Sequence, residues 1–298
     1  MALGYPAEVA LARAVGAGGA ISRIEAAAHR HGATGTAALV ARQHRCRDVD
    51  EGRVDLRVGH LPGDHDAALV GLGGDGGEGH RNYAKRVMAQ DQVEVMAALG
   101  FDRFHLAGHD RGARIAHRLA LDHPQAVERL ALLDIAPTLG VVSSLKPAVA
   151  TGAYHWFFLI QPAPLPETLI GGDPEFYLRW HLRSWSDGED GFFDPRAVAE
   201  YVRCHSDPAA IHATYEDMRA LMSIDLEHDR ADLDRRSECP LFVLWGSKFR
   251  PGDLRATWID RARDVSGRAL DCGHFLADER PDETAAALLA FFSAGTGD

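Results

Sequence analysis

Residues 103–114 read Arg-Phe-His-Leu-Ala-Gly-His-Asp-Arg-Gly-Ala-Arg, and this stretch decides the fold. Residues 103–108 have the apolar character of a short buried strand, and residues 111–122 have the pattern of a helix that ends before Pro124. Between them, the string Gly-x-Asp-x-Gly places small residues on both sides of Asp110. Small residues allow a sharp turn that exposes the central side chain. The sequence therefore predicts a strand, a tight turn and a helix, with Asp110 at the turn.

The remainder of the chain after residue 80 continues this alternation of strands and helices. Apolar runs typical of buried parallel strands occur at residues 130–135, 240–245 and 265–270. Helical patterns cover residues 83–99 and 282–292. We therefore predict an α/β fold, a mostly parallel sheet with helices on both faces.

The predicted core is divided into two parts along the chain, residues 80–139 and 237–298. The intervening residues 140–236 are helical in pattern and rich in aromatic residues, without the alternation of strands. This segment is predicted to form a helical lid inserted between two strands of the sheet.

The first 79 residues differ from the rest and contain only one of the 23 aromatic residues, Tyr5. By propensity, residues 7–14 and 22–29 are predicted to be helical, and residues 71–79 form a glycine-rich loop. Residues 54–58 and 67–70 are weak strand candidates. The strands expected to precede residues 103–108 in such a sheet are therefore doubtful here.

One hypothesis explains this N-terminal composition. Three lysines against 29 arginines suggest GC-rich coding DNA. Translation of such DNA out of frame tends to give Ala, Arg, Gly and His, the residues that dominate this segment. We hypothesise that residues 1–79 are frameshifted or otherwise altered. Resequencing that finds no in-frame alternative coding for strands upstream of His80 would contradict the hypothesis.

Composition excludes several classes of function. The formal net charge of −11 argues against a general binder of nucleic acid or of anionic membranes, which needs clustered Lys and Arg. The four cysteines contain no C-x-x-C pair, so neither a zinc site nor a disulfide framework is indicated, and reduced thiols are expected. No signal peptide or membrane span is evident. We expect a cytoplasmic protein that acts on a small molecule.

The turn at Asp110 has the form of a nucleophile elbow with Asp where hydrolases usually carry Ser. A carboxylate is ionised at neutral pH, needs no base to attack a saturated carbon, and forms an ester. Hydrolysis of that ester requires an activated water, hence a histidine. His274, after the last predicted strand, is the candidate base, and Asp134, near the end of residues 130–135, is the candidate acid that orients it. Asp253 is a rival acid.

Two arginines flank the predicted nucleophile. The guanidinium groups of Arg111 and Arg114 suit recognition of a small carboxylate, because each can donate two parallel hydrogen bonds. The alternative is that each arginine forms an ion pair with a nearby acid.

Residues 80–298 resemble the fluoroacetate (haloacetate) dehalogenases of the α/β-hydrolase superfamily, through three stretches. These are Gly108-His-Asp-Arg-Gly-Ala-Arg114, Leu133-Asp-Ile-Ala-Pro-Thr138 and His155-Trp-Phe-Phe-Leu-Ile-Gln-Pro-Ala-Pro-Leu-Pro-Glu167. The resemblance implies an α/β-hydrolase fold with no metal or organic cofactor, and it is compatible with a homodimer.

The resemblance also implies a role for each matching residue. Asp110 attacks the carbon that bears the halogen, Arg111 and Arg114 hold the substrate carboxylate, and Asp134 and His274 drive ester hydrolysis. The N–H groups of His155 and Trp156 donate hydrogen bonds to the departing halide.

The chain departs from the family pattern in two places. Met218 stands where the family has a tyrosine as a third halide donor, and a thioether cannot donate a hydrogen bond. Tyr215 lies three residues earlier, but the sequence alone does not assign it the role. Residues 1–79 contain no match to the family's His-Gly-x-Pro-like turn, which supplies an oxyanion-hole amide.

The sequence thus predicts a hydrolytic dehalogenase that converts a short 2-haloacid to the 2-hydroxy acid. One alternative is an epoxide hydrolase, which uses the same Asp nucleophile, requires two lid tyrosines and has no need of Arg111. The other alternative is an inactive, degenerate protein of the hydrolase fold.

Overall fold

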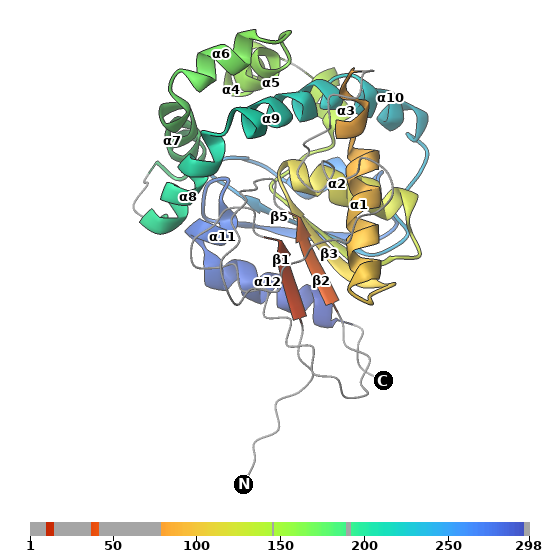
Figure 1. Ribbon diagram of the computed structural model, residues 1–298. Helices are drawn as coiled ribbons and strands as arrows, with labels where there is room; N and C mark the ends of the chain where they lie inside the picture. Colours follow the sequence, from red (N-terminus) through yellow and green to blue (C-terminus); the bar gives the residue numbers. More distant parts are fainter. Residues whose placement is uncertain (1–9, 15–36, 42–78, 145, 189–191, 295–298) are drawn as a thin grey trace.

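The computed structural model describes residues 10–14, 37–41, 79–144, 146–188 and 192–294, which are drawn as ribbons in Figure 1. Its centre is one sheet of six parallel strands whose spatial order, β1-β2-β3-β4-β5-β6, is the order along the chain. The strands are β1 (Ala10–Ala14), β2 (Ala37–Ala41), β3 (Phe104–His109), β4 (Val127–Leu133), β5 (Leu241–Gly246) and β6 (Val265–Leu270).

The structure corrects the prediction for part of the N-terminal segment. Residues 10–14, predicted as helix, form strand β1, and residues 37–41 form β2, which pairs with the nucleophile strand β3. Hydrogen bonding to a neighbouring strand outweighs the modest helix preference of alanine, which is a weak determinant of structure. The predicted helix at 22–29, the strand candidates at 54–58 and 67–70, and all of the predicted loop except residue 79 lie outside the described residues.

Helices cover both faces of the sheet, as predicted. Side chains along the central strands alternate between two cores: Leu130 and Leu132 of β4 belong to one, and Ala131 and Leu133 to the other. Helices α1 (Lys85–Ala98) and α2 (Arg111–Asp122) pack together over the first core. Helix α12 (Pro281–Ser293) covers the second.

The chain between β4 and β5 forms a helical lid, which lies above the sheet in Figure 1. Three of its helices begin at an Asp-Pro pair, at Asp173, Asp194 and Asp207. Each Asp side chain accepts a hydrogen bond from a backbone N–H of the first turn, and the following Pro loses no helical bond there. The lid helices are α3 (Thr138–Ser143), α4 (Pro147–Gly152), α5 (Tyr154–Leu159), α6 (Leu165–Gly171), α7 (Pro174–Trp185), α8 (Pro195–His205), α9 (Pro208–Leu221) and α10 (Ile224–Ala231).

Two further expectations concern cysteines and membranes. Cys239 and Cys272 are free thiols, whereas Cys204 is disulfide-bonded, so the expectation of reduced cysteines is wrong at Cys204. Within the described part of the chain, every helix is too short or too polar to span a bilayer.

Candidate active site

Asp110 occupies the turn between β3 and α2 in a conformation that few residues adopt. Its φ is 52° and its ψ is −124°, in a region unfavourable for side chains with a Cβ. The turn also brings the backbone of α2 against β3, since a Cβ on Gly108 would lie 2.6 Å from the Cα of Ala113. The predicted strand, tight turn and helix are therefore present, and glycine at position 108 is a steric requirement.

The carboxylate of Asp110 lies among positive groups at the N-terminus of α2. Burial alone raises the pKa of Asp110, but the charges of His274, Arg111 and His109 act against it and hold that pKa well below its usual value. The N-terminus of a helix also favours a negative charge. Asp110 is consequently ionised at neutral pH and available to attack an electrophilic carbon.

Asp134 and His274 meet although 140 residues separate them in sequence. His274 Nδ1 lies 2.6 Å from Asp134 Oδ2, and both side chains are buried. Asp134 follows β4 directly with a φ of 51°, and its Oδ1 accepts a hydrogen bond of 3.0 Å from the backbone N–H of Gly246. Asp253, the rival acid, is exposed and pairs with Arg255. The structure thus pairs His274 with Asp134.

The loop that carries His274 is held by a residue that the sequence analysis did not identify. Glu279 is buried and accepts hydrogen bonds from the backbone N–H groups of Gly273 and Phe275, at 2.7 and 3.0 Å. The backbone N–H of His274 itself donates to the carbonyl of Trp185 in the lid, at 2.7 Å. Core and lid therefore fix the position of this histidine jointly.

The ends of β5 and of the His274 loop approach so closely that only glycine fits at position 246. A Cβ there would lie 1.8 Å from the backbone oxygen of Gly273. We expect Gly246→Ala to lower the melting temperature by about 5 °C or more, because overpacking costs about 1–3 kcal/mol. Thermal unfolding followed by circular dichroism measures this. The matched control is Gly140→Ala in α3, where the Cβ has open space and no loss is expected. Equal melting temperatures for the two variants would contradict the assignment.

The two arginines beside Asp110 have different partners. Arg111 donates to Asp217 Oδ2 at 2.9 Å and to the carbonyl of Thr214 at 3.3 Å. Asp217 also pairs with the buried Lys85, so Arg111 shares this acid with a second cation. The alternative interpretation, in which each arginine forms an ion pair with a nearby acid, therefore holds for Arg111.

Arg114 is buried and makes no ion pair with a carboxylate among the described residues. Its Nη1 donates to the carbonyl of Ala136 at 3.2 Å and to the hydroxyl of Thr138, and its guanidinium lies 5.0 Å from the ring centroid of Trp156. Burial lowers the pKa of Arg114 to about 10, which leaves it charged at neutral pH. A buried cation with neutral partners is suited to binding an anionic ligand.

A cavity of about 160 Å³ lies between the nucleophile turn and the lid. Asp110, Arg111, Arg114 and His274 line it from the core. The lid contributes the predicted halide donors His155 and Trp156. It also contributes residues that the sequence did not assign to the site, among them Tyr177, His181, His205 and Tyr215. The structure therefore brings every predicted site residue to one cavity except Asp134, which acts behind His274.

Four polar side chains of the lid part of the cavity have buried atoms without a hydrogen-bond partner among the described residues: His155 Nδ1, His205 Nε2 and the hydroxyls of Tyr177 and Tyr215. Burial, followed by the nearby His181, lowers the pKa of His155 to about 3. His155 is therefore neutral at pH 7 and carries one N–H. Aromatic residues in a helical segment usually indicate core, and for that reason the sequence did not identify Tyr177 or assign a role to Tyr215.

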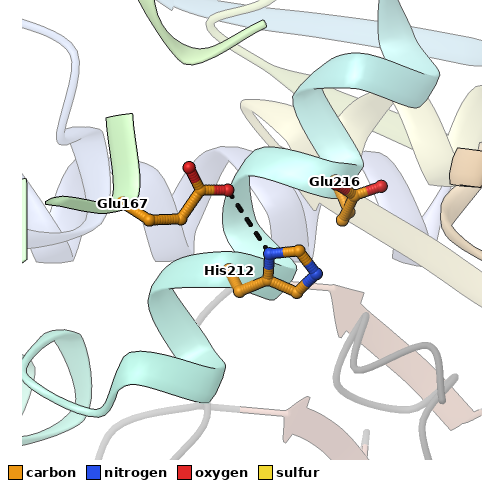
Figure 2. Close-up of side chains that lie close together, drawn as sticks. All are labelled: Glu167, His212 and Glu216. Carbon is orange, nitrogen blue, oxygen red and sulfur yellow. Dashed lines mark hydrogen bonds and ion pairs between the residues drawn. The ribbon is translucent and has the colours of Figure 1, made fainter. Parts of the chain in front are cut away.

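A second cluster of potential metal ligands lies outside this cavity. Glu167 of α6 and His212 and Glu216 of α9 have ligand atoms within 4.8 Å of one another (Figure 2). However, Arg219 Nη1 lies 2.8 Å from Glu167 Oε1 and 2.5 Å from Glu216 Oε1, and His80 Nδ1 lies 2.5 Å from Glu216 Oε2. The guanidinium already forms ion pairs with both carboxylates. The cluster is an ion-pair network that joins α6 to α9, and we assign it no cation.

Comparison with known proteins places this site in context. A family description of the α/β-hydrolase fold matches residues 69–281. The chain is 45% identical to a fluoroacetate dehalogenase from Burkholderia sp. over 235 residues, which cover 76% of this chain and 77% of the relative. It is 32% identical to a soluble epoxide hydrolase from Corynebacterium sp. (strain C12) over 228 residues, which cover 76% and 79%.

Solved structures show the same similarity. ALR0039 from Nostoc sp. PCC 7120, classed as an α/β hydrolase, superposes with a TM-score of 0.71 at 57% identity and covers 72% of this chain and 75% of its own. The epoxide hydrolase CorEH superposes with a TM-score of 0.67 at 32% identity, covering 74% and 78%.

Proposed function

The chain belongs to the α/β-hydrolase family, and from this premise we propose that it is a hydrolytic dehalogenase converting a short 2-haloacid, such as a haloacetate, to the 2-hydroxy acid and halide. One observation carries the proposal. The ionised Asp110 opens into a small cavity between two guanidinium groups, Arg111 and Arg114, of which Arg114 has no carboxylate partner among the described residues. Similarity to the Burkholderia fluoroacetate dehalogenase supports it.

The first step requires no proton transfer. A carboxylate oxygen of Asp110 attacks the carbon that bears the halogen, and the carbon–halogen bond breaks as its electron pair leaves with the halide. Arg111 and Arg114 hold the substrate carboxylate and thereby fix the carbon within reach of Asp110. His155 and Trp156 donate hydrogen bonds to the departing halide, whose developing charge would otherwise be unsolvated.

The second step hydrolyses the ester. Water attacks the carbonyl carbon of the Asp110 ester while His274 Nε2 accepts the proton of that water. Asp134 accepts the Nδ1–H of His274 and stabilises the imidazolium that forms. Collapse of the tetrahedral intermediate releases the 2-hydroxy acid, and one oxygen of the regenerated Asp110 carboxylate comes from solvent.

The carboxylate clamp has a direct test in Arg114→Gln. We expect kcat/KM for chloroacetate to fall roughly 10- to 100-fold, chiefly through KM, because a charge-assisted hydrogen bond contributes about 1.5–3 kcal/mol. Activity on uncharged chloroacetamide should change little. Chloride release from both substrates gives the ratio of kcat/KM for chloroacetate to kcat/KM for chloroacetamide. Arg255→Gln, which alters an exposed arginine paired with Asp253, is the control. Equal losses on both substrates would remove Arg114 from carboxylate binding.

One observation favours a second candidate, an epoxide hydrolase. That reaction requires two lid tyrosines to protonate the opening oxygen, and Tyr177 and Tyr215 both line the cavity with hydroxyls that have no partner among the described residues. The similarity to the Corynebacterium epoxide hydrolase agrees with this alternative. An epoxide hydrolase reaction gives Arg111 and Arg114 no role, and we therefore place this candidate second.

Ion-specific measurement of halide release from chloroacetate and fluoroacetate, compared with diol formation from a simple epoxide, separates the two candidates. Halide release supports the dehalogenase, and diol formation alone supports the epoxide hydrolase. Turnover of neither would favour a degenerate hydrolase fold.

A further inference from the structure

We propose that the hydroxyl of Tyr215 donates a hydrogen bond to the departing halide, on the side of the cavity where Met218 cannot. The inference rests on the proposed dehalogenase function and adds a catalytic residue to it. It also predicts which halogens the enzyme handles best.

Tyr215 and Met218 lie on the same face of α9, three residues apart, and both line the cavity. Their exposed fractions are 0% and 2%. They belong to one hydrophobic cluster, against which Trp156, one of the proposed halide donors, is packed. Tyr215 is thus placed where a donor from α9 can act together with Trp156.

The Tyr215 hydroxyl is buried and has no hydrogen-bond partner among the described residues. Leaving a buried hydroxyl unpaired is unfavourable, so its retention calls for a ligand that pairs with it. Burial, together with the nearby Tyr177 hydroxyl, raises the pKa of Tyr215 above its usual value. The phenol therefore keeps its proton and acts as a hydrogen-bond donor.

The chemistry needs only that donor. As the Asp110 oxygen forms its bond to carbon, the halide departs with the electron pair of the broken bond and accepts a hydrogen bond from the Tyr215 O–H. The proton stays on the phenol throughout. Tyr215 then compensates in part for Met218, whose thioether offers a polarisable, apolar contact instead of a hydrogen bond.

This arrangement predicts a halogen preference. Fluoride has the greatest need for hydrogen bonds because its charge is compact, whereas chloride and bromide are larger and more polarisable. With a thioether and only one phenol on the α9 side of the cavity, the site should remove chloride and bromide faster than fluoride.

The test is Tyr215→Phe, assayed on chloroacetate and bromoacetate, and on fluoroacetate wherever the unaltered chain turns it over. Loss of one hydrogen-bond donor to the transition state should lower kcat by roughly 10²-fold for the halide that depends on it most. The loss should be smallest for bromide. The ratio of kcat for chloroacetate to bromoacetate should therefore fall. Tyr154→Phe is the matched control, because Tyr154 is a lid tyrosine whose hydroxyl contacts His181 and which does not line the cavity.

Thermal unfolding provides an independent measurement. Because Tyr215→Phe removes an unpaired buried hydroxyl, the melting temperature should stay the same or rise. An unchanged halide ratio, or a lower melting temperature with equal losses on all substrates, would overturn the role of Tyr215 while the dehalogenase function stood. Absence of halide release by the unaltered chain would overturn the proposed function itself.

Discussion

Replacing Asp110 with Asn is expected to abolish halide release, with kcat/KM falling by roughly 10⁴-fold or more. The amide has no negative charge to attack carbon, and the remaining groups of the cavity contribute only binding and hydrogen bonding. Asn retains the size of Asp and tolerates the positive φ of this turn, so the fold should persist. Halide release, melting temperature and intact mass are measured together, the last to show that the introduced amide has not been deamidated back to the acid.

Isotope labelling tests the same nucleophile without a mutation. If water attacks the carbonyl carbon of the ester, a single turnover in ¹⁸O-labelled water places the label in Asp110 and leaves the product unlabelled. Mass spectrometry of the peptide that contains Asp110 locates the label. Label found only in the 2-hydroxy acid would mean that water attacks the substrate directly, and Asp110 would then be excluded as the nucleophile.

The second large effect is expected from His274→Asn, which should stop turnover after the first step. Ester formation needs no base, so the variant should release one equivalent of halide and retain the carboxymethyl group of the substrate as an ester on Asp110. Hydrolysis should slow by roughly 10⁴-fold, because the variant lacks the imidazole that the buried Asp134 orients to accept the proton of the attacking water. Intact-mass spectrometry after addition of chloroacetate detects the trapped ester, and chloride measurement gives the stoichiometry.

Asp253→Asn provides the matched control for this experiment. Asp253 follows β5 but is exposed and paired with Arg255, so its replacement should leave full turnover and no trapped ester. If His274→Asn formed no ester, or if it continued to turn over, another residue would have to serve as the base.

Local sequence predicted the elements around the nucleophile well. The helix at 111–122 and the strand at 265–270 have the predicted bounds, and the strand before Asp110 is shifted by one residue. Glycine and proline residues mark the ends of these elements and apolar runs mark the buried strands, so the signals lie within the elements themselves. The preference for Asp134 over Asp253 also agrees with the geometry, because chain order along parallel strands indicates which side chains meet at one edge of the sheet.

Other features depend on tertiary contacts and were not predictable. Strand β1 is alanine-rich and has the local propensity of a helix, and only its neighbour β2 makes it a strand. Tyr177 and Tyr215 are indistinguishable in sequence from core aromatics, and the lack of a partner for their hydroxyls among the described residues emerges only when the lid is placed over the cavity. Glu279 is likewise unmarked in the sequence, since its role emerges only when the backbone N–H groups of the His274 loop and that of Asp187, just after α7, meet its carboxylate.

The insertion of the lid between β4 and β5 has a consequence for synthesis on the ribosome. Asp134 and His274 are 140 residues apart, and a ribosome adding roughly 5–20 residues per second needs about 7–30 s to cover that interval. During that time the emerging chain contains Asp110, the proposed nucleophile, but lacks His274, the base proposed to regenerate it. The enzyme can therefore turn over more than once only after the last strand and its histidine loop have left the exit tunnel.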